Sequence, residues 1–249
     1  MRGGNHLPPA LTKPGLRPAT MTFRQLLLAF AVAGAALDAG AMNGAVAGPD
    51  TAVPSPWDPA FAAFAADDAA HPHPAGGVLF VGSSSIRLWS DLEAQFSDLP
   101  VVINRGFGGS QLSDCVKNLN RLVLRYRPRT VLVYAGDNDL AAGVAPADVR
   151  RRFVAFVDGV HRDLPETRIV YISIKPSPSR IGLLARIRET NALISDYADA
   201  EGNVDYVDVF TPMLDAAGEP RRDLFRADAL HLNAKGYALW KKVIAPQVW

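Results

Sequence analysis

Short apolar runs rich in β-branched residues alternate with longer segments from Gly77 onward. Most of these runs are apolar at nearly every position, whereas a strand with one face in water alternates apolar and polar residues. Continuous apolar strands are typical of a parallel sheet that is covered on both faces. The sequence therefore predicts buried parallel strands. They lie at residues 78–81, 101–103, 130–134, 168–174 and 204–209.

The segments between these runs carry apolar residues at helical spacing. The clearest stripe extends over 149–164, and Pro146 marks the start of its helix because proline is favoured in the first helical turn. A second stripe extends over 184–197. Since strand and helix alternate, we expect an α/β fold over residues 77–249, a doubly wound parallel sheet with helices on both faces in a flavodoxin-like three-layer sandwich.

The N-terminal part has a different pattern. An arginine precedes an apolar run at 26–37, and small residues follow up to an Ala-Val-Ala sequence at 45–47. Basic, apolar and small-residue segments in this order are typical of a secretory signal. The apolar run is shorter than the roughly 20 residues of a membrane-spanning helix. We therefore expect a leader over 1–47, starting at Met1 or Met21, and an exported protein, periplasmic or extracellular, without a stable membrane span after removal of the signal.

Residues 48–76 read as a linker rich in proline and alanine. A short helix is expected after Asp58, because Pro59 follows as a first helical residue. His71 and His73 suggest a metal site, but no Cys, Asp or Glu stands near them at ligand spacing. A solvated linker is the favoured interpretation, and we expect no bound metal.

Composition narrows the class of protein further. With 249 residues, 49% of them hydrophobic, the chain can bury one substantial core. Its 26 Lys and Arg nearly balance 25 Asp and Glu, so nothing indicates a nucleic-acid partner. Gln111 stands where a dinucleotide-binding loop needs its third glycine, and no phosphate-binding loop occurs. We expect a small-molecule or glycan substrate and no cofactor.

The lone cysteine, Cys115, excludes an internal disulfide. We expect it in a helix as a packing residue.

Polar clusters follow the predicted strands. An open parallel sheet binds its ligands beyond the C-terminal ends of its strands, so these clusters are expected along one rim. A further cluster precedes the C-terminal helix. The clusters are Gly82-Ser83-Ser84-Ser85, Asn104 to Ser110, Gly136-Asp137-Asn138-Asp139 and Asp228-Ala-Leu-His231.

Histidine is the side chain best suited to proton transfer near neutral pH. The chain has 5 histidines; one lies in the leader, two lie in the linker and His161 lies on a predicted helix. His231 remains, and Asp228 stands three residues before it. A carboxylate at that spacing can accept the Nδ1 proton and fix the ring so that Nε2 faces a pocket.

A nucleophile and oxyanion donors complete such a site. A serine on a strand-to-helix turn projects its oxygen at the rim, although spacing alone does not choose among Ser83, Ser84 and Ser85, and a serine-rich helix cap is the structural alternative. A Gly108-Gly109 pair allows close approach of a backbone N–H, and the Asn138 amide is a second donor.

These clusters resemble the sequence blocks of the SGNH hydrolases, also called GDSL-type esterases and lipases. The resemblance extends from about Gly77 to the C-terminus and rests on all four blocks in order. It implies that Ser84 is the nucleophile, that Asp228 and His231 complete the triad, and that the N–H groups of Ser84 and Gly109 with the Asn138 amide form the oxyanion hole. The family often has Asp at the position of Ser83.

The expected function is therefore hydrolysis of carboxylic esters, with the acyl group left open among lipase, esterase, thioesterase and O-deacetylase substrates. A non-catalytic carbohydrate-binding or surface protein on the same scaffold is the alternative, because a fold does not fix a function. Residues 175–178, Lys-Pro-Ser-Pro, either border the pocket or form a rigid turn, and their prolines favour the turn.

Overall fold

The computed structural model describes residues 55–248. The predicted leader over 1–47 and both candidate start residues lie outside this range. Within the range, no helix is both long and apolar enough to cross a membrane.

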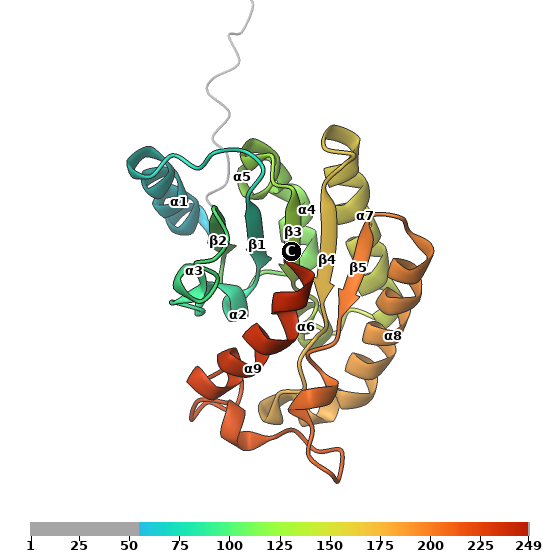
Figure 1. Cartoon of the computed structure of the whole chain (residues 1–249). Helices are drawn as coiled ribbons and strands as arrows, with labels where there is room; N and C mark the ends of the chain where they lie inside the picture. The colour runs from blue at the N-terminus through green and yellow to red at the C-terminus, as the bar shows by residue number, and fades with distance from the viewer. Residues whose placement is uncertain (1–54, 249) are drawn as a thin grey trace, which may run out of the picture. The chain divides into compact units, whose positions relative to one another are not determined.

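Five parallel strands form one sheet in the order β2-β1-β3-β4-β5 (Figure 1). In register, Val78 of β1 lies beside Val102 of β2 and Thr130 of β3. The first strand thus lies inside the sheet, with β2 added on one side and β3, β4 and β5 added in turn on the other, which confirms the predicted doubly wound class. The strands are β1 Val78–Gly82, β2 Val102–Gly106, β3 Thr130–Tyr134, β4 Arg168–Ile172 and β5 Val204–Val207.

The predicted strands and helices correspond to observed ones. Strands predicted at 168–174 and 204–209 end two residues earlier, and the strand predicted at 101–103 continues to Gly106. The helices are α1 Asp58–Ala70, α2 Ser84–Arg87, α3 Leu92–Gln95, α4 Leu112–Lys117, α5 Leu119–Leu122, α6 Asp137–Ala141, α7 Pro146–Asp163, α8 Leu184–Ala200 and α9 Ala234–Ile244. Short 3₁₀ turns are η1 Leu124–Tyr126, η2 Pro178–Leu183, η3 Thr211–Met213, η4 Arg222–Leu224 and η5 Ala245–Gln247.

The sheet separates two hydrophobic layers, because successive strand residues point to opposite faces. Leu79 and Val81 pack with residues of α4, α7 and α8. Val78 and Phe80 pack with residues of α2, α3 and α9 on the other face. Both faces of the sheet are therefore buried, as the continuous apolar strands predicted, and this explains why its polar chemistry lies at the rim. Cys115 belongs to the first layer, where burial raises the pKa of its thiol.

Helix α1 packs against the sheet domain, although its sequence read as part of a linker. Phe61 is buried in the core beside Phe107. The guanidinium of Arg105, on β2, bonds Asp67 and Asp68 at 3.0 and 2.5 Å. The sequence indicated a solvated linker here, because the residues that contact α1 belong to a strand that is distant in the sequence and their contacts cannot be seen in the α1 segment alone. The folded unit thus includes α1.

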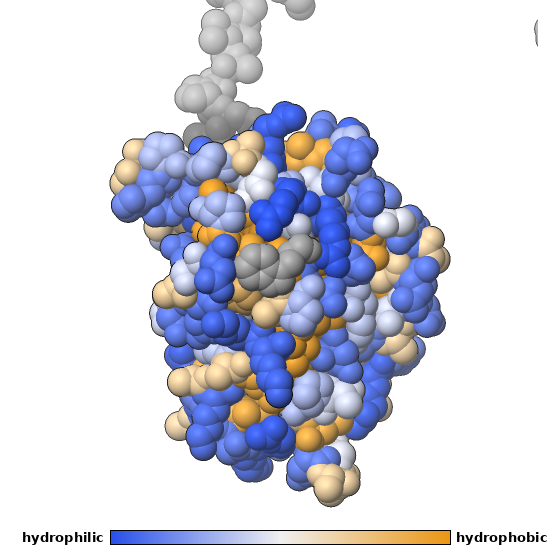
Figure 2. Space-filling view, viewed as in Figure 1, coloured by the Kyte–Doolittle hydropathy of each residue, from blue (hydrophilic) through white to orange (hydrophobic). Residues whose placement is uncertain are grey.

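The view in Figure 2 shows hydrophilic residues over much of this face, with hydrophobic residues in smaller areas. Among the residues that the structure describes, Ile181 is the one large hydrophobic side chain classed as exposed, at 46%. It borders the pocket described below.

Candidate active site

The turn after β1 requires glycine at its first position. Gly82 has φ +132°, and a Cβ added there would lie 1.9 Å from the carbonyl oxygen of Tyr134 on the neighbouring strand. The N–H of Ser83 donates to that same carbonyl at 2.9 Å. The chain therefore leaves the sheet in a tightly held turn, and Ser84 is the first residue of α2.

The three consecutive serines have different surroundings. Ser83 is buried, and its hydroxyl has no hydrogen-bond partner within residues 55–248. Ser85 is also buried, and its Oγ accepts from Lys175 Nζ at 3.1 Å. Ser84 is half-buried, and its Oγ lies 3.0 Å from His231 Nε2. Burial and hydrogen bonding thus favour Ser84 as the serine that meets both a base and a ligand.

His231 is fixed by the loop that also carries Asp228. Its Nδ1 lies 2.7 Å from Asp228 Oδ2, and its own backbone N–H donates to Asp228 Oδ1 at 2.9 Å. Leu230 N donates to the same oxygen. The backbone N–H of His231, its ring and the N–H of Leu230 hold the pKa of the Asp228 carboxyl well below its usual range. The carboxylate is therefore charged at neutral pH, and it orients the imidazole.

The loop between these two residues contains a backbone outlier. Ala229 has φ +56°, a left-handed conformation that is uncommon for residues other than glycine. Ser179 N donates to the Ala229 carbonyl at 3.0 Å. The segment after β4 thus stabilises the turn that places the Asp228 carboxylate next to the His231 ring.

Two of the three predicted oxyanion donors, Gly109 and Asn138, lie on segments that a hydrogen bond connects. Gly109 follows β2 with φ +78°, and its backbone is exposed. Asn138 lies in the first turn of α6, and its Nδ2 donates to the carbonyl of Ser110 at 3.0 Å. This bond uses one of the two Nδ2 hydrogens and leaves the other for a ligand. The structure thus joins the Gly109 loop to the Asn138 amide through Ser110.

A buried ionic network lies next to these groups, and the sequence interpretation did not foresee it, although it named Asp137 in a rim cluster and Lys175 in a segment that could border the pocket. Lys175 is 1% exposed, and its Nζ lies 3.3 Å from Asp137 Oδ2 and 3.0 Å from the hydroxyl of Tyr134. Arg180 Nη1 lies 3.0 Å from the same carboxylate oxygen. Residues 175–178 were favoured as a rigid turn, but Lys175 belongs to this network. The available signal was a charged residue directly after a buried apolar strand.

The pKa values in the network follow from burial and charge. Burial acts to raise the pKa of Asp137, but the adjacent Lys175 and Arg180 cations outweigh it, so the pKa is lowered. Burial lowers the pKa of Lys175, and Asp137 opposes that shift. Asp137 thus acts as the counter-ion of two cations inside the fold.

One cluster within residues 55–248 has metal-ligand residue types, namely Asp67, Asp68 and His73. Arg105 Nη2 lies 3.0 Å from Asp67, 2.5 Å from Asp68 and 3.1 Å from His73 Nε2. The guanidinium therefore occupies the position between the three groups that a cation would take. This cluster is a structural anchor for α1, and the prediction that His73 is solvated does not hold, because its side chain is only 16% exposed.

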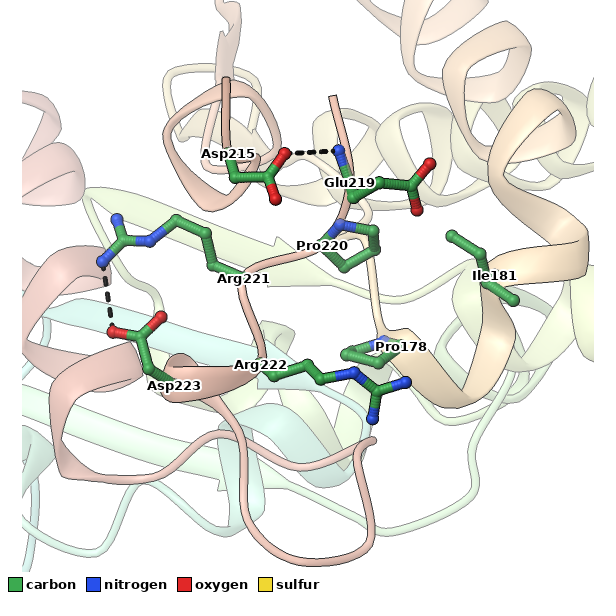
Figure 3. A pocket seen from close by; sticks show the side chains of 8 residues that line it. All are labelled: Pro178, Ile181, Asp215, Glu219, Pro220, Arg221, Arg222 and Asp223. Atoms are coloured by element: carbon green, nitrogen blue, oxygen red, sulfur yellow. Dashed lines mark hydrogen bonds and ion pairs between the residues drawn. The ribbon is translucent and has the colours of Figure 1, made fainter. Parts of the chain in front are cut away.

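A pocket of about 720 Å³ is lined by residues of η2 and by residues between 215 and 223, and neither the loop of Asp228 and His231 nor any other predicted site residue lines it. One wall is formed by Pro178 and Ile181, and the other by residues 215–223 (Figure 3). The bond from Ser179 to Ala229 connects the first wall to the loop. Five of the eight lining residues are charged, so the pocket offers polar groups that can bond a ligand.

Comparison with known proteins identifies a related family. The model of the GDSL-like lipase/acylhydrolase family matches residues 80–239, which include every predicted site residue. No curated protein sequence matches the chain at a significant level.

Several solved structures have the same fold. A protein from Streptococcus pneumonia, provisionally assigned as a platelet activating factor, is 23% identical with a TM-score of 0.68 over 77% of this chain and 92% of its own. A GDSL-like lipase from Bacteroides thetaiotaomicron is 20% identical with a TM-score of 0.65, over 76% and 96%. A carbohydrate esterase of family 3 from Talaromyces cellulolyticus is 19% identical with a TM-score of 0.57, over 69% and 95%. At these identities the likeness establishes the fold alone.

Proposed function

This chain belongs to the GDSL-like lipase/acylhydrolase family, and we propose that it is a serine esterase that cleaves carboxylic esters through an acyl-enzyme on Ser84. Family membership supports the hydrolysis of esters, and the proposal adds the residues and the covalent step. The single observation that carries it is the hydrogen-bonded series from Ser84 Oγ to His231 Nε2 at 3.0 Å and from His231 Nδ1 to Asp228 at 2.7 Å.

In the proposed reaction, Ser84 Oγ attacks the carbonyl carbon of the ester while His231 Nε2 takes the hydroxyl proton. The carbonyl oxygen gains negative charge, and the backbone N–H groups of Ser84 and Gly109 with the Asn138 amide donate to it. Asp228 stabilises the protonated imidazole. His231 then gives the proton to the leaving alcohol oxygen as the ester C–O bond breaks.

Water completes the cycle. His231 takes a proton from a water molecule as the water oxygen attacks the acyl carbon. The bond between the acyl carbon and Ser84 Oγ then breaks as His231 returns the proton to Oγ. The products are a carboxylic acid and the free enzyme. No metal or organic cofactor takes part in these steps.

We further propose a polar leaving alcohol, such as a sugar hydroxyl. The pocket supports a polar leaving group, because its Glu219 and Arg222 side chains can hydrogen-bond hydroxyls and its η2 wall is hydrogen-bonded to the catalytic loop. The neighbour named as a carbohydrate esterase agrees with this choice. Hydrolysis of acetylated xylan, compared with that of p-nitrophenyl acetate, tests it. Turnover of p-nitrophenyl acetate without release of acetate from acetylated xylan would contradict it.

The predicted signal supports export to the periplasm or the cell exterior, where glycan esters are accessible. This placement remains a proposal, as does the small-molecule or glycan partner.

A fluorophosphonate probe tests the proposed nucleophile directly, because it labels an activated serine. We expect labelling and p-nitrophenyl acetate hydrolysis in the natural protein and in Ser83→Ala, and loss of both in Ser84→Ala. Ser85→Ala is a second control and is expected to keep a measurable fraction. Labelling retained in Ser84→Ala would reject the assignment. A folded natural protein that neither reacts with the probe nor cleaves any ester would favour the non-catalytic alternative.

A further inference from the structure

Arg180 lies between the buried acid and the candidate oxyanion amide. Its side chain is 16% exposed and comes from η2, after β4. Nη2 donates to Asn138 Oδ1 at 2.8 Å, and Nη1 lies 3.0 Å from Asp137 Oδ2. One guanidinium therefore connects two adjacent residues of α6 from a segment 42 residues away.

We propose that Arg180 is a positioning residue that fixes the orientation of the Asn138 amide, an inference that rests on the proposed function of Asn138 in the oxyanion hole. The two ends of an Asn amide differ chemically, since Oδ1 only accepts hydrogen bonds and Nδ2 only donates. A flipped amide would present an acceptor where the oxyanion needs a donor.

The neighbours of Asn138 admit one orientation of the amide. Arginine has only donors, so the end of Asn138 facing Arg180 is the oxygen. The carbonyl of Ser110 has only an acceptor, so the end facing it is Nδ2. In a flipped amide, Nδ2 would face the guanidinium and Oδ1 would face a carbonyl, and both hydrogen bonds would be lost. The Nδ2 hydrogen that remains is then available to the substrate.

The side chain of Arg180 is held in turn by Asp137, which accepts hydrogen bonds on both of its carboxylate oxygens. Asp137 Oδ2 accepts from Lys175 at 3.3 Å and from the Tyr134 hydroxyl at 3.2 Å, beside its ion pair with Arg180. Its other oxygen, Oδ1, accepts from the backbone N–H of Asn138 at 2.9 Å. Asp137 thus fixes the main chain of Asn138 directly and its side chain through Arg180.

A direct contact of Arg180 with substrate is the competing role, because Pro178 and Ile181 on either side of it line the pocket. The two roles differ in kinetics. Positioning of an oxyanion donor acts on the transition state, so its loss lowers kcat with little change in KM. Loss of a substrate contact made equally in the ground state raises KM.

The test is a double-mutant cycle on p-nitrophenyl acetate hydrolysis with Arg180→Ala, Asn138→Ala and the double variant. We expect Arg180→Ala to lower kcat about tenfold or more, short of the roughly 10²- to 10³-fold loss for an oxyanion donor. The double variant is expected within about threefold of Asn138→Ala alone, because Arg180 acts through that amide. Added guanidinium ion should restore part of the activity of Arg180→Ala and none in the double variant.

Two variants separate positioning from general stability. Arg180→Lys keeps the charge but lacks the planar fork that reaches both groups, so kcat should stay low. Arg129→Ala is the matched control, because Arg129 bonds two carbonyls at the opposite end of the sheet, on Gly76 and Val248. It is expected to lower the melting temperature while keeping kcat.

Three kinetic results would overturn the inference. They are losses in kcat that multiply in the double variant, an unchanged kcat in Arg180→Ala, and an effect of Arg180→Ala confined to a higher KM. A crystal structure of Arg180→Ala in which the Asn138 amide keeps its place and its bond to Ser110 would also overturn it; this measurement does not depend on activity. Ser84→Ala in the same assay separates the two proposals. If that variant stays active, the proposed function fails; if it is inactive while Arg180→Ala is normal, only the role of Arg180 fails.

Discussion

The variant Asp137→Asn tests how much the buried ionic network of Asp137, Lys175 and Arg180 contributes to the stability of the fold. The substitution keeps the size of the side chain and an oxygen that can accept from the backbone of Asn138. It removes the negative charge next to Lys175 and Arg180. Lys175 then has neutral neighbours at its ammonium, the hydroxyls of Tyr134 and Ser85.

The magnitude follows from the burial of Lys175, which is 1% exposed. Removing one partner of a buried ion pair costs about 3 to 5 kcal/mol, because an uncompensated charge is left inside the fold. In a domain of this size each kcal/mol lowers the melting temperature by roughly 2 to 4 °C. We therefore expect a fall of about 6 to 20 °C at pH 7.

Thermal unfolding and urea unfolding, both followed by tryptophan fluorescence at pH values from 3 to 10, are the assays. The folded-state pKa of Asp137 is lowered, so its stabilising contribution is present above about pH 4 and is lost as the pH falls through the folded-state pKa. The difference between the two proteins should shrink in acid. Without Asp137 the lowered pKa of Lys175 falls further, so the variant gains stability as the pH rises toward about 10 and the difference narrows there too.

Lys175→Met is the companion variant. It removes the cation and leaves Asp137 with Arg180 as counter-ion, so it is expected to cost less than Asp137→Asn. The double variant should be more stable than Asp137→Asn alone, because no buried ammonium remains. Equal melting temperatures for Asp137→Asn and the natural protein at pH 7, or a double variant less stable than Asp137→Asn, would refute the reasoning.

Further measurements test the other parts of the site. Asn138→Ala should lower kcat by roughly 10² to 10³ with little change in KM, and Asn138→Asp should be at least as damaging; a destabilised variant with normal kcat would remove this residue from the site. Gly82→Ala should unfold at clearly lower temperature, because its Cβ would overlap the carbonyl of Tyr134, and an unchanged melting curve would contradict the observed turn. Prolonged chelation should leave hydrolysis unchanged, whereas loss that added zinc reverses would contradict the serine mechanism. The N-terminus of secreted protein should begin near Gly48, and mature protein that retains residues 26–37 would reject export by a cleaved signal.

The sequence by itself determined the strands, the long helices and the class of sheet. Each depends on a local pattern in a short stretch of chain, such as the continuous apolar run at 130–134 and the helical stripe that begins after Pro146. The short spacing of Asp228 and His231 likewise indicated that the two side chains meet, because only three residues of one loop separate them. The resemblance to a known family then selected Ser84, a choice that spacing had left open.

The tertiary structure decided which groups surround these residues. Ser84 meets His231 across 147 residues, and its neighbours are excluded from this contact by burial in the turn after β1. Arg105 on β2 forms an ion pair with Asp68 of α1, and Arg180, from the segment after β4, donates a hydrogen bond to Asn138. No periodic pattern in the sequence marks these side chains for their contacts, because their partners lie on other elements of the fold. Their roles arise only when the parallel strands bring the ends of distant segments to one rim.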